Sequence, residues 1–171
     1  MLNSNLKNLI IVLVLVFVFM SCGQDEKLPK PSLSSLVIGS WVGIEKQMTS
    51  TFVYPMSGGS TLTGVQEWTV IFYTKGEFDF IVSLAMSVDG KSIGVVKFVT
   101  KGSYEAFESS IAFRPDSIEM QVTPPELKPV MDVAFKNQLE VFKNAFTGTM
   151  SASVSDNVLL LENGPGRFQK V

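Results

Sequence analysis

The longest regular pattern in the chain is an alternation of apolar and polar residues with a period of two over residues 65–104. Successive side chains of an extended strand point to opposite faces, so this alternation predicts strands with one buried face. Lys75-Gly76 and Asp89-Gly90 interrupt it and are typical of tight hairpin turns. The stretch therefore predicts an antiparallel meander. Its apolar face comprises Trp68, Val70, Phe72, Phe78, Phe80, Val82, Leu84, Met86 and Val88.

Shorter segments with strand character occupy much of the remaining chain. They are residues 40–53, 93–107, 110–114, 117–122, 146–154, 158–162 and 167–171. Turn-forming residues separate several of them, namely Pro115-Asp116, Ser155-Asp156-Asn157 and Asn163-Gly164-Pro165-Gly166. Eight to ten short strands predict a sandwich or a closed barrel, and closure removes exposed strand edges. We therefore expect a mainly β fold, an antiparallel up-and-down β-barrel of 8–10 strands.

One segment, about residues 125–146, breaks this pattern. Its apolar residues recur at the spacing of one helix face, and they are Met131, Phe135, Leu139, Phe142 and Phe146. Residues 123–126 have the form of a capping box, but Pro129 makes a start near Lys128 equally compatible. We expect one inserted α-helix, which either packs on or plugs the barrel or forms a lid over a cavity mouth.

The first 21 residues have the three-part plan of an export signal. Lys7 precedes an unbroken apolar run, Leu9 to Met20, and the small residue Ser21 follows. The run is shorter than the roughly 20 apolar residues that a membrane-spanning helix needs. Residues 1–21 are therefore expected to be a signal peptide.

The segment Phe19-Met20-Ser21-Cys22 resembles the bacterial lipobox, although Phe19 stands where that motif usually has Leu. In a lipobox the cysteine is lipidated on sulfur and becomes the first residue of the mature chain. The resemblance implies that Cys22 carries a diacylglyceryl group and an amide-linked acyl chain such as palmitate, which together give durable membrane anchoring. An ordinary cleaved signal followed by an incidental cysteine is the alternative.

Residues 22–37 have the composition of a flexible tether, polar and with Pro29 and Pro31. Gly23 stands where an inner-membrane retention signal resembling that of enteric bacteria would have Asp, which favours sorting to the outer membrane. We expect a lipid-anchored protein of the cell envelope, on the periplasmic or the surface face. The folded domain is then expected to span residues 38–171.

The composition argues against several classes of function. The 14 basic and 16 acidic residues are spread along the chain and give a net charge of −2, unlike the clustered basic stripe of nucleic-acid-binding proteins. The chain has one Cys and no His, which argues against a disulfide, a zinc site and a Ser-His-Asp triad. Glu67, Asp79, Glu105 and Glu119 lie on strand candidates, but they form no motif and fit solvated strand faces. We expect no enzyme activity, no cofactor and no metal.

"IGSWVG", residues 38–43, resembles the Gly-x-Trp signature at the start of the first strand in lipocalins and the wider calycin group. "KGSYEAFESSIAF" and "FTGTMSASVSDNVLLLENGPGRFQKV" are similar to the strand pattern of small lipocalin-like domains on bacterial lipoproteins. The resemblance implies that Gly39 and Trp41 close the base of a barrel. It also implies that Arg167 packs across Trp41 if the last strand returns to the first. The helical segment departs from the family pattern.

Two functions remain open. The first is a lipocalin-like module that binds a small apolar or amphipathic ligand, since an eight-stranded barrel is either filled by side chains or has room for one small ligand. Its expected ligand-binding residues are Trp68, Phe72, Phe78, Phe80, Leu84 and Met86. The second is a structural or protein-interaction lipoprotein with a filled barrel that acts through its surface. A cavity would favour the first function and a filled interior the second.

Overall fold

The structure of the chain is a computed structural model that describes residues 32–44, 51–55 and 59–171. The expected signal peptide, Cys22 and the tether up to residue 31 lie outside the described residues.

The described residues form a mainly β fold with nine strands in one antiparallel sheet. The strands are β1 (Gly39–Gly43), β2 (Thr51–Pro55), β3 (Thr61–Phe72), β4 (Glu77–Val88), β5 (Lys91–Ala106), β6 (Ser110–Thr123), β7 (Gly148–Ser155), β8 (Val158–Glu162) and β9 (Gly166–Lys170). Sequential strands pair from β2 to β9, and β1 pairs with both β9 and β3. Eight strands therefore close an up-and-down barrel, as the sequence predicts, and β2 extends the sheet beside β3.

The predicted hairpin turns are confirmed. Gly76, Asp89 and Gly90 have φ values of 76°, 49° and 77°, which glycine and aspartate adopt more easily than most residues. Asp156 and Asn157, between β7 and β8, also have positive φ values, 50° and 60°. Two successive residues with positive φ match the right-handed twist of the flanking strands.

The prediction of a turn at Pro115-Asp116 is wrong, because these residues lie inside β6. Lys101 of β5 pairs with Ser117 and Gly102 pairs with Pro115, so Asp116 is the extra residue of a β-bulge. The inward-facing residues of β6 have odd numbers before the bulge and even numbers after it. In the sequence this change of phase makes β6 look like two separate strands. Proline has no N–H to donate and fits such a bulge.

The helical segment also differs from the prediction of a single helix. It consists of a 3-10 turn, η1 (Pro125–Leu127), and two helices, α3 (Lys128–Ala134) and α4 (Gln138–Asn144). Pro129 lies in the first turn of α3, where a missing N–H costs nothing. The apolar stripe survives the break between the helices: Met131 and Phe146 are buried, and the three residues between them in the stripe are half-buried.

The folded part begins before the predicted domain boundary at residue 38. Residues 33–37 form a short helix, α2 (Leu33–Val37), and are not a flexible tether. Leu33 and Val37 are four residues apart, so both lie on one helix face, and both are buried in the core. The Nε1 of Trp41 donates a hydrogen bond to the Val37 carbonyl at 2.6 Å, which ties α2 to β1.

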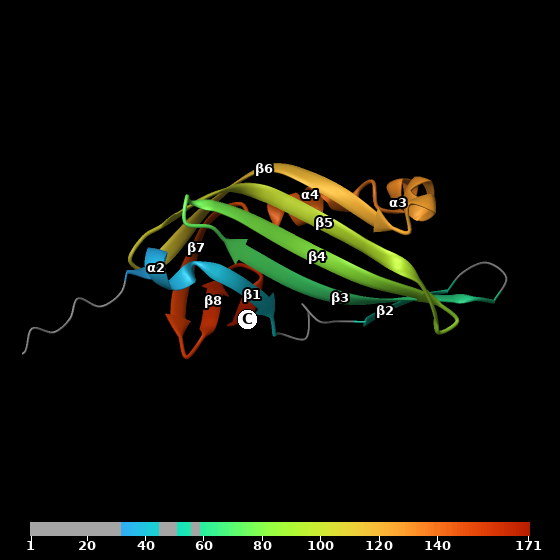
Figure 1. Cartoon of the computed structure of the whole chain (residues 1–171), viewed down its shortest axis with the longest axis horizontal. Helices are drawn as coiled ribbons and strands as arrows, with labels where there is room; N and C mark the ends of the chain where they lie inside the picture. The colour runs from blue at the N-terminus through green and yellow to red at the C-terminus, as the bar shows by residue number, and fades with distance from the viewer. Residues whose placement is uncertain (1–31, 45–50, 56–58) are drawn as a thin grey trace, which may run out of the picture. The chain divides into compact units, whose positions relative to one another are not determined.

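The sheet has two parts, which Figure 1 shows along its length. We call the first the closed end, where β1 and β7–β9 complete the barrel against residues 69–72 of β3 and 110–113 of β6. The second, the distal half, consists of residues 61–68, 82–100 and 117–123 of the long strands, with α3 and α4. In Figure 1, α4 lies beneath the arch of β5 and β6, the two strands that it contacts.

Candidate functional site

Aromatic side chains fill the closed end. The Phe146 ring is fully buried, and its centroid lies 4.1 Å from that of Phe80, 5.0 Å from Phe113 and 6.0 Å from Phe78. The Phe72 ring contacts Phe113 and also the Tyr104 ring. The structure therefore places three of the expected ligand-binding residues in the core of the closed end. They are Phe72 and Phe78, which contact Phe113, and Phe80, which contacts Phe146.

The expected closure residues lie at the base of the barrel. Trp41 is fully buried on β1 and pairs in register with Val70 on one side and Lys170 on the other. The Lys170 ammonium lies 5.2 Å from the Trp41 ring centroid, a cation–π contact, and donates to the Leu36 carbonyl at 3.5 Å.

Lys170 therefore occupies the position expected of Arg167. The last strand does return to the first, but Arg167 pairs with Leu160 of β8 and its side chain is exposed. Gly39 has a φ of 125°, and a Cβ there would lie 3.2 Å from Cε of Lys170. A glycine at this position leaves room for the lysine stem to reach the indole.

The inner face of the distal half is apolar, but much of it is only half-buried. Val82, Leu84, Met86, Val96 and Phe98 form a buried centre. Around this centre lie half-buried apolar side chains from the strands and the helices: Leu62, Trp68, Ile93, Ile118, Met120, Val122, Leu127, Phe135, Leu139 and Phe142. The remaining three expected ligand residues, Trp68, Leu84 and Met86, belong to this face.

Two buried polar groups lie where the closed end meets the distal half. Thr100 is fully buried, and its Oγ1 has no hydrogen-bond partner; the same holds for the Nε1 of Trp68. Both adjoin Phe80, since Thr100 is its register partner on β5 and the Trp68 ring meets the Phe80 ring edge-on at 5.4 Å. Buried polar groups are nearly always hydrogen-bonded in folded proteins, so this pair requires an explanation.

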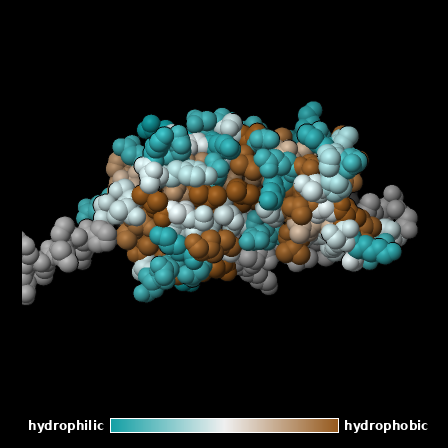
Figure 2. All heavy atoms as spheres, in the orientation of Figure 1, coloured by the Kyte–Doolittle hydropathy of each residue, from teal (hydrophilic) through white to brown (hydrophobic). Residues whose placement is uncertain are grey.

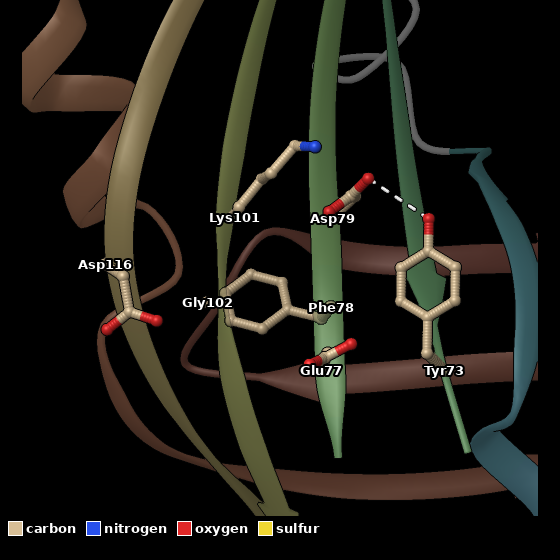
Figure 3. A pocket seen from close by; sticks show the side chains of 7 residues that line it. All are labelled: Tyr73, Glu77, Phe78, Asp79, Lys101, Gly102 and Asp116. Atoms are coloured by element: carbon tan, nitrogen blue, oxygen red, sulfur yellow. Dashed lines mark hydrogen bonds between the residues drawn. The ribbon is translucent and has the colours of Figure 1, made fainter. Parts of the chain in front are cut away.

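A hollow of about 430 Å³ lies on the outer face of the sheet, beside the β6 bulge. Its lining residues are Tyr73, Glu77, Phe78, Asp79, Lys101, Gly102 and Asp116. Figure 3 shows the Phe78 ring beside Gly102, with Asp79 and Lys101 reaching out from neighbouring strands. A Cβ at residue 102 would clash with the Arg114 carbonyl and lie 2.7 Å from Cα of Pro115, so the bulge requires glycine.

One hydrogen bond joins two polar side chains of this hollow. The Tyr73 hydroxyl donates to Oδ2 of Asp79 at 3.1 Å, the dashed line in Figure 3. Partial burial, this hydrogen bond and the nearby carboxylates of Asp79 and Glu77 raise the pKa of Tyr73 above its usual value of 10.0. With three carboxylates and one ammonium the hollow is acidic and open to water, which fits a solvated strand face.

The carboxylates named from the sequence do not converge. Glu67, Glu105 and Glu119 are exposed on different strands, and Asp79 is held by Tyr73. Within residues 32–44 and 59–171, no three acidic or cysteine side chains lie close enough together to hold a metal ion.

Sequence reasoning missed Lys170, Thr100 and the division of the sheet. A basic residue three positions after Arg167 was a visible alternative for the contact with Trp41. No sequence signal marks Thr100, since threonine is common on both faces of strands.

No known protein family matches the chain, and a search among curated proteins found no relative. The eight-stranded closed barrel is consistent with the lipocalin-like architecture that the sequence motifs suggest. None of the helices in the described residues has the length and apolar character needed to cross a bilayer.

Proposed function

We propose that this protein is a lipid-anchored binding module, and not an enzyme, which holds a small apolar or amphipathic molecule in its distal half. One observation carries the proposal: the apolar side chains around the buried centre of the distal half are only half-buried, although fully buried rings fill the closed end. Half-buried apolar side chains gathered on one face are suited to contact an apolar molecule.

The location differs from the interior of the barrel that the sequence suggested. Phe146 and the rings around it occupy the closed end, so a ligand has to lie beyond the Phe80–Phe146 contact. The helices α3 and α4 lie over β5 and β6, and the side toward β3 presents Leu62 and Trp68. We assign the ligand to this side, with Leu139 and Phe135 of the helical segment as its opposite wall.

The anchor is supported by sequence alone. Residues 1–21 and Cys22 fit a lipoprotein signal and a lipidated cysteine, and we propose attachment to the outer membrane on its periplasmic or surface face. Changing Cys22 to Ala should release the protein from the membrane fraction of its host. Retention of the variant in that fraction would contradict the proposed lipid anchor. It would not bear on the proposal of ligand binding.

The binding proposal is tested by native mass spectrometry of the full chain extracted from a cell envelope. We expect a co-purifying small molecule on the wild type and on Val141→Ala, but reduced occupancy on Leu139→Ala. The two positions form a matched pair, because both lie on α4 while Leu139 faces the core and Val141 is 65 % exposed. Loss of the isopropyl group of the half-buried Leu139 should weaken binding roughly fivefold. Equal occupancy in all three proteins would contradict the assigned wall.

A second candidate function is favoured by the outer side of the helices. Val130, Val133 and Val141 are 63 %, 81 % and 65 % exposed on the two short helices, and exposed apolar side chains of this kind can contribute to a protein interface. Figure 2 shows other hydrophobic atoms at the surface in separate patches on the face drawn. If a protein partner uses the helices, Val133→Ser should abolish its co-purification and leave small-molecule occupancy unchanged.

A further inference from the structure

The two unpaired polar groups at the inner end of the distal half bear on the chemistry of the ligand. Thr100 Oγ1 and Trp68 Nε1 are both shielded from water, and neither has a protein partner. An indole N–H is a donor only, and a threonine hydroxyl can donate. Leaving such a donor buried and unpaired destabilises a protein. A ligand acceptor at this place would remove that penalty.

The position of these groups fits the end of a binding site. Both border Phe80, whose ring contacts Phe146, the residue that fills the closed end. The Phe80–Phe146 contact therefore forms a floor, and Thr100 and Trp68 lie beside it on β5 and β3. From this floor the inner face continues along Leu84 and Met86, which are apolar. The site therefore changes from polar at the floor to apolar along the strands. A ligand with a polar group at one end and an apolar body would match it.

The surroundings favour a neutral acceptor over a charged one. The residues in register around Thr100 are Phe80 and Ile118, and those around Trp68 are Val82 and, one strand further, Phe98. None of these carries a positive charge that would compensate a buried carboxylate, and an uncompensated ion in such surroundings is strongly disfavoured. A carbonyl oxygen accepts hydrogen bonds without this penalty.

We infer that the ligand of the distal half is an apolar molecule with a neutral carbonyl group, a ketone, ester or amide, which accepts hydrogen bonds from Trp68 Nε1 and Thr100 Oγ1. The inference rests on the proposed binding function and specifies the ligand class of the same site.

The test compares three probes of equal chain length: a medium-chain methyl ketone, the alkane and the fatty carboxylate. Binding to the full chain in lipid nanodiscs is measured by equilibrium dialysis against empty nanodiscs. We expect the ketone to bind about tenfold more tightly than the alkane, the usual effect of one or two well-placed hydrogen bonds. With the ketone labelled at its carbonyl carbon, the bound carbonyl resonance should move downfield, as it does on accepting a hydrogen bond.

Thr100→Val keeps the shape of the side chain and removes its hydroxyl, and Trp68→Phe removes the N–H. Each should reduce the preference for the ketone over the alkane. Thr63→Val is the matched control, because the Thr63 hydroxyl already has a partner in Ser87 at 2.6 Å. Circular dichroism confirms that each variant is folded.

The outcomes separate the two ideas. Ketone and alkane binding of equal strength, or tightest binding of the carboxylate, would overturn the inference and leave the binding function intact. A ketone preference that survives both Thr100→Val and Trp68→Phe would also overturn it. Failure of all three probes to bind would contradict the proposed function itself, and the inference with it.

Discussion

The closed end and the distal half are built on the same four long strands, β3–β6, yet their interiors differ. In the closed end the inner positions carry fully buried rings such as Phe113, Phe146 and Phe168. In the distal half the inner positions of β6 carry Ile118, Met120 and Val122, all half-buried against the helices. The same alternation of side chains thus lines two different interiors. The core is packed where strands close the barrel, and it is incompletely covered where the short helices lie in place of strands. A continuous sheet can therefore combine a packed core with an apolar face that is only partly covered.

The largest effect that would separate the two parts is the loss of Phe146. Phe146→Ala removes a fully buried ring and should lower the free energy of unfolding by about 3–5 kcal/mol, since the rings around it cannot collapse into the space. Phe142→Ala in the distal half should cost about 1–2 kcal/mol, because part of that ring is already in water. Urea denaturation measures both. Equal costs would mean that the two interiors are packed alike.

The bulge that shifts β6 between the two parts gives the next effect. Gly102→Ala places a methyl group against the Arg114 carbonyl and 2.9 Å from Cε1 of Phe78, and overpacking of this kind costs about 1–3 kcal/mol. Ser103→Ala, at the exposed neighbouring residue, should change stability by less than about 0.5 kcal/mol. The midpoint of thermal unfolding reports both. An unchanged midpoint for Gly102→Ala would show that the bulge relaxes freely.

Alkaline pH should affect the closed end first. Burial raises the pKa of Tyr104, and burial with the hydrogen bond to Asp79 raises that of Tyr73. The folded state therefore holds these protons more tightly than the unfolded state does. The stabilisation is complete below pH 10 and is lost as pH rises through the raised pKa values. The denaturation midpoint should fall above pH 10, and less steeply in Tyr104→Phe. An identical fall in that variant would assign the loss to other groups.

Acidic pH should produce the smallest effect, at the distal tip. The backbone N–H of Thr61 donates to Oδ1 of Asp89 at 2.7 Å, and this hydrogen bond lowers the pKa of Asp89 below its usual 3.8. A depressed pKa stabilises the folded state above pH 3.8, and this contribution is lost as pH falls through the lowered value. The protection factor of the Thr61 amide against hydrogen exchange should fall at low pH, with the protection of the β8 amides unchanged. Asp89→Asn keeps an accepting oxygen that is not protonated in this range, so its Thr61 protection should not change with pH.

Much of the fold follows from local patterns in the sequence. The alternation around Phe78 and Phe80 and the Asp89-Gly90 turn are strong because each depends only on neighbouring residues. The β6 bulge was mistaken for a turn because proline and aspartate favour turns in general, and only the cross-strand space beside Gly102 decides otherwise. The sequence does not predict α2, because two apolar residues, Leu33 and Val37, are too few to show a helical period.

The candidate site was harder to predict than the fold. Trp68 and Phe80 share one strand-face pattern, but one lines the distal half and the other the core of the closed end. What separates them is Phe146, which is far away in sequence and reaches Phe80 only in the folded chain. The same holds for Lys170 over Trp41, a contact made by the two ends of the domain.

That last contact also has a consequence for how the chain folds as it is made. The barrel closes only when β9 pairs with β1. Trp41 and Lys170, which lie near opposite ends of the domain's sequence, then become neighbours. Contacts between such distant residues form slowly, because the entropy of closing a long loop is lost before they contribute. A chain that emerges from its N-terminus can have no complete barrel until its last few residues are free. Until then the sheet stays open between β1 and β9.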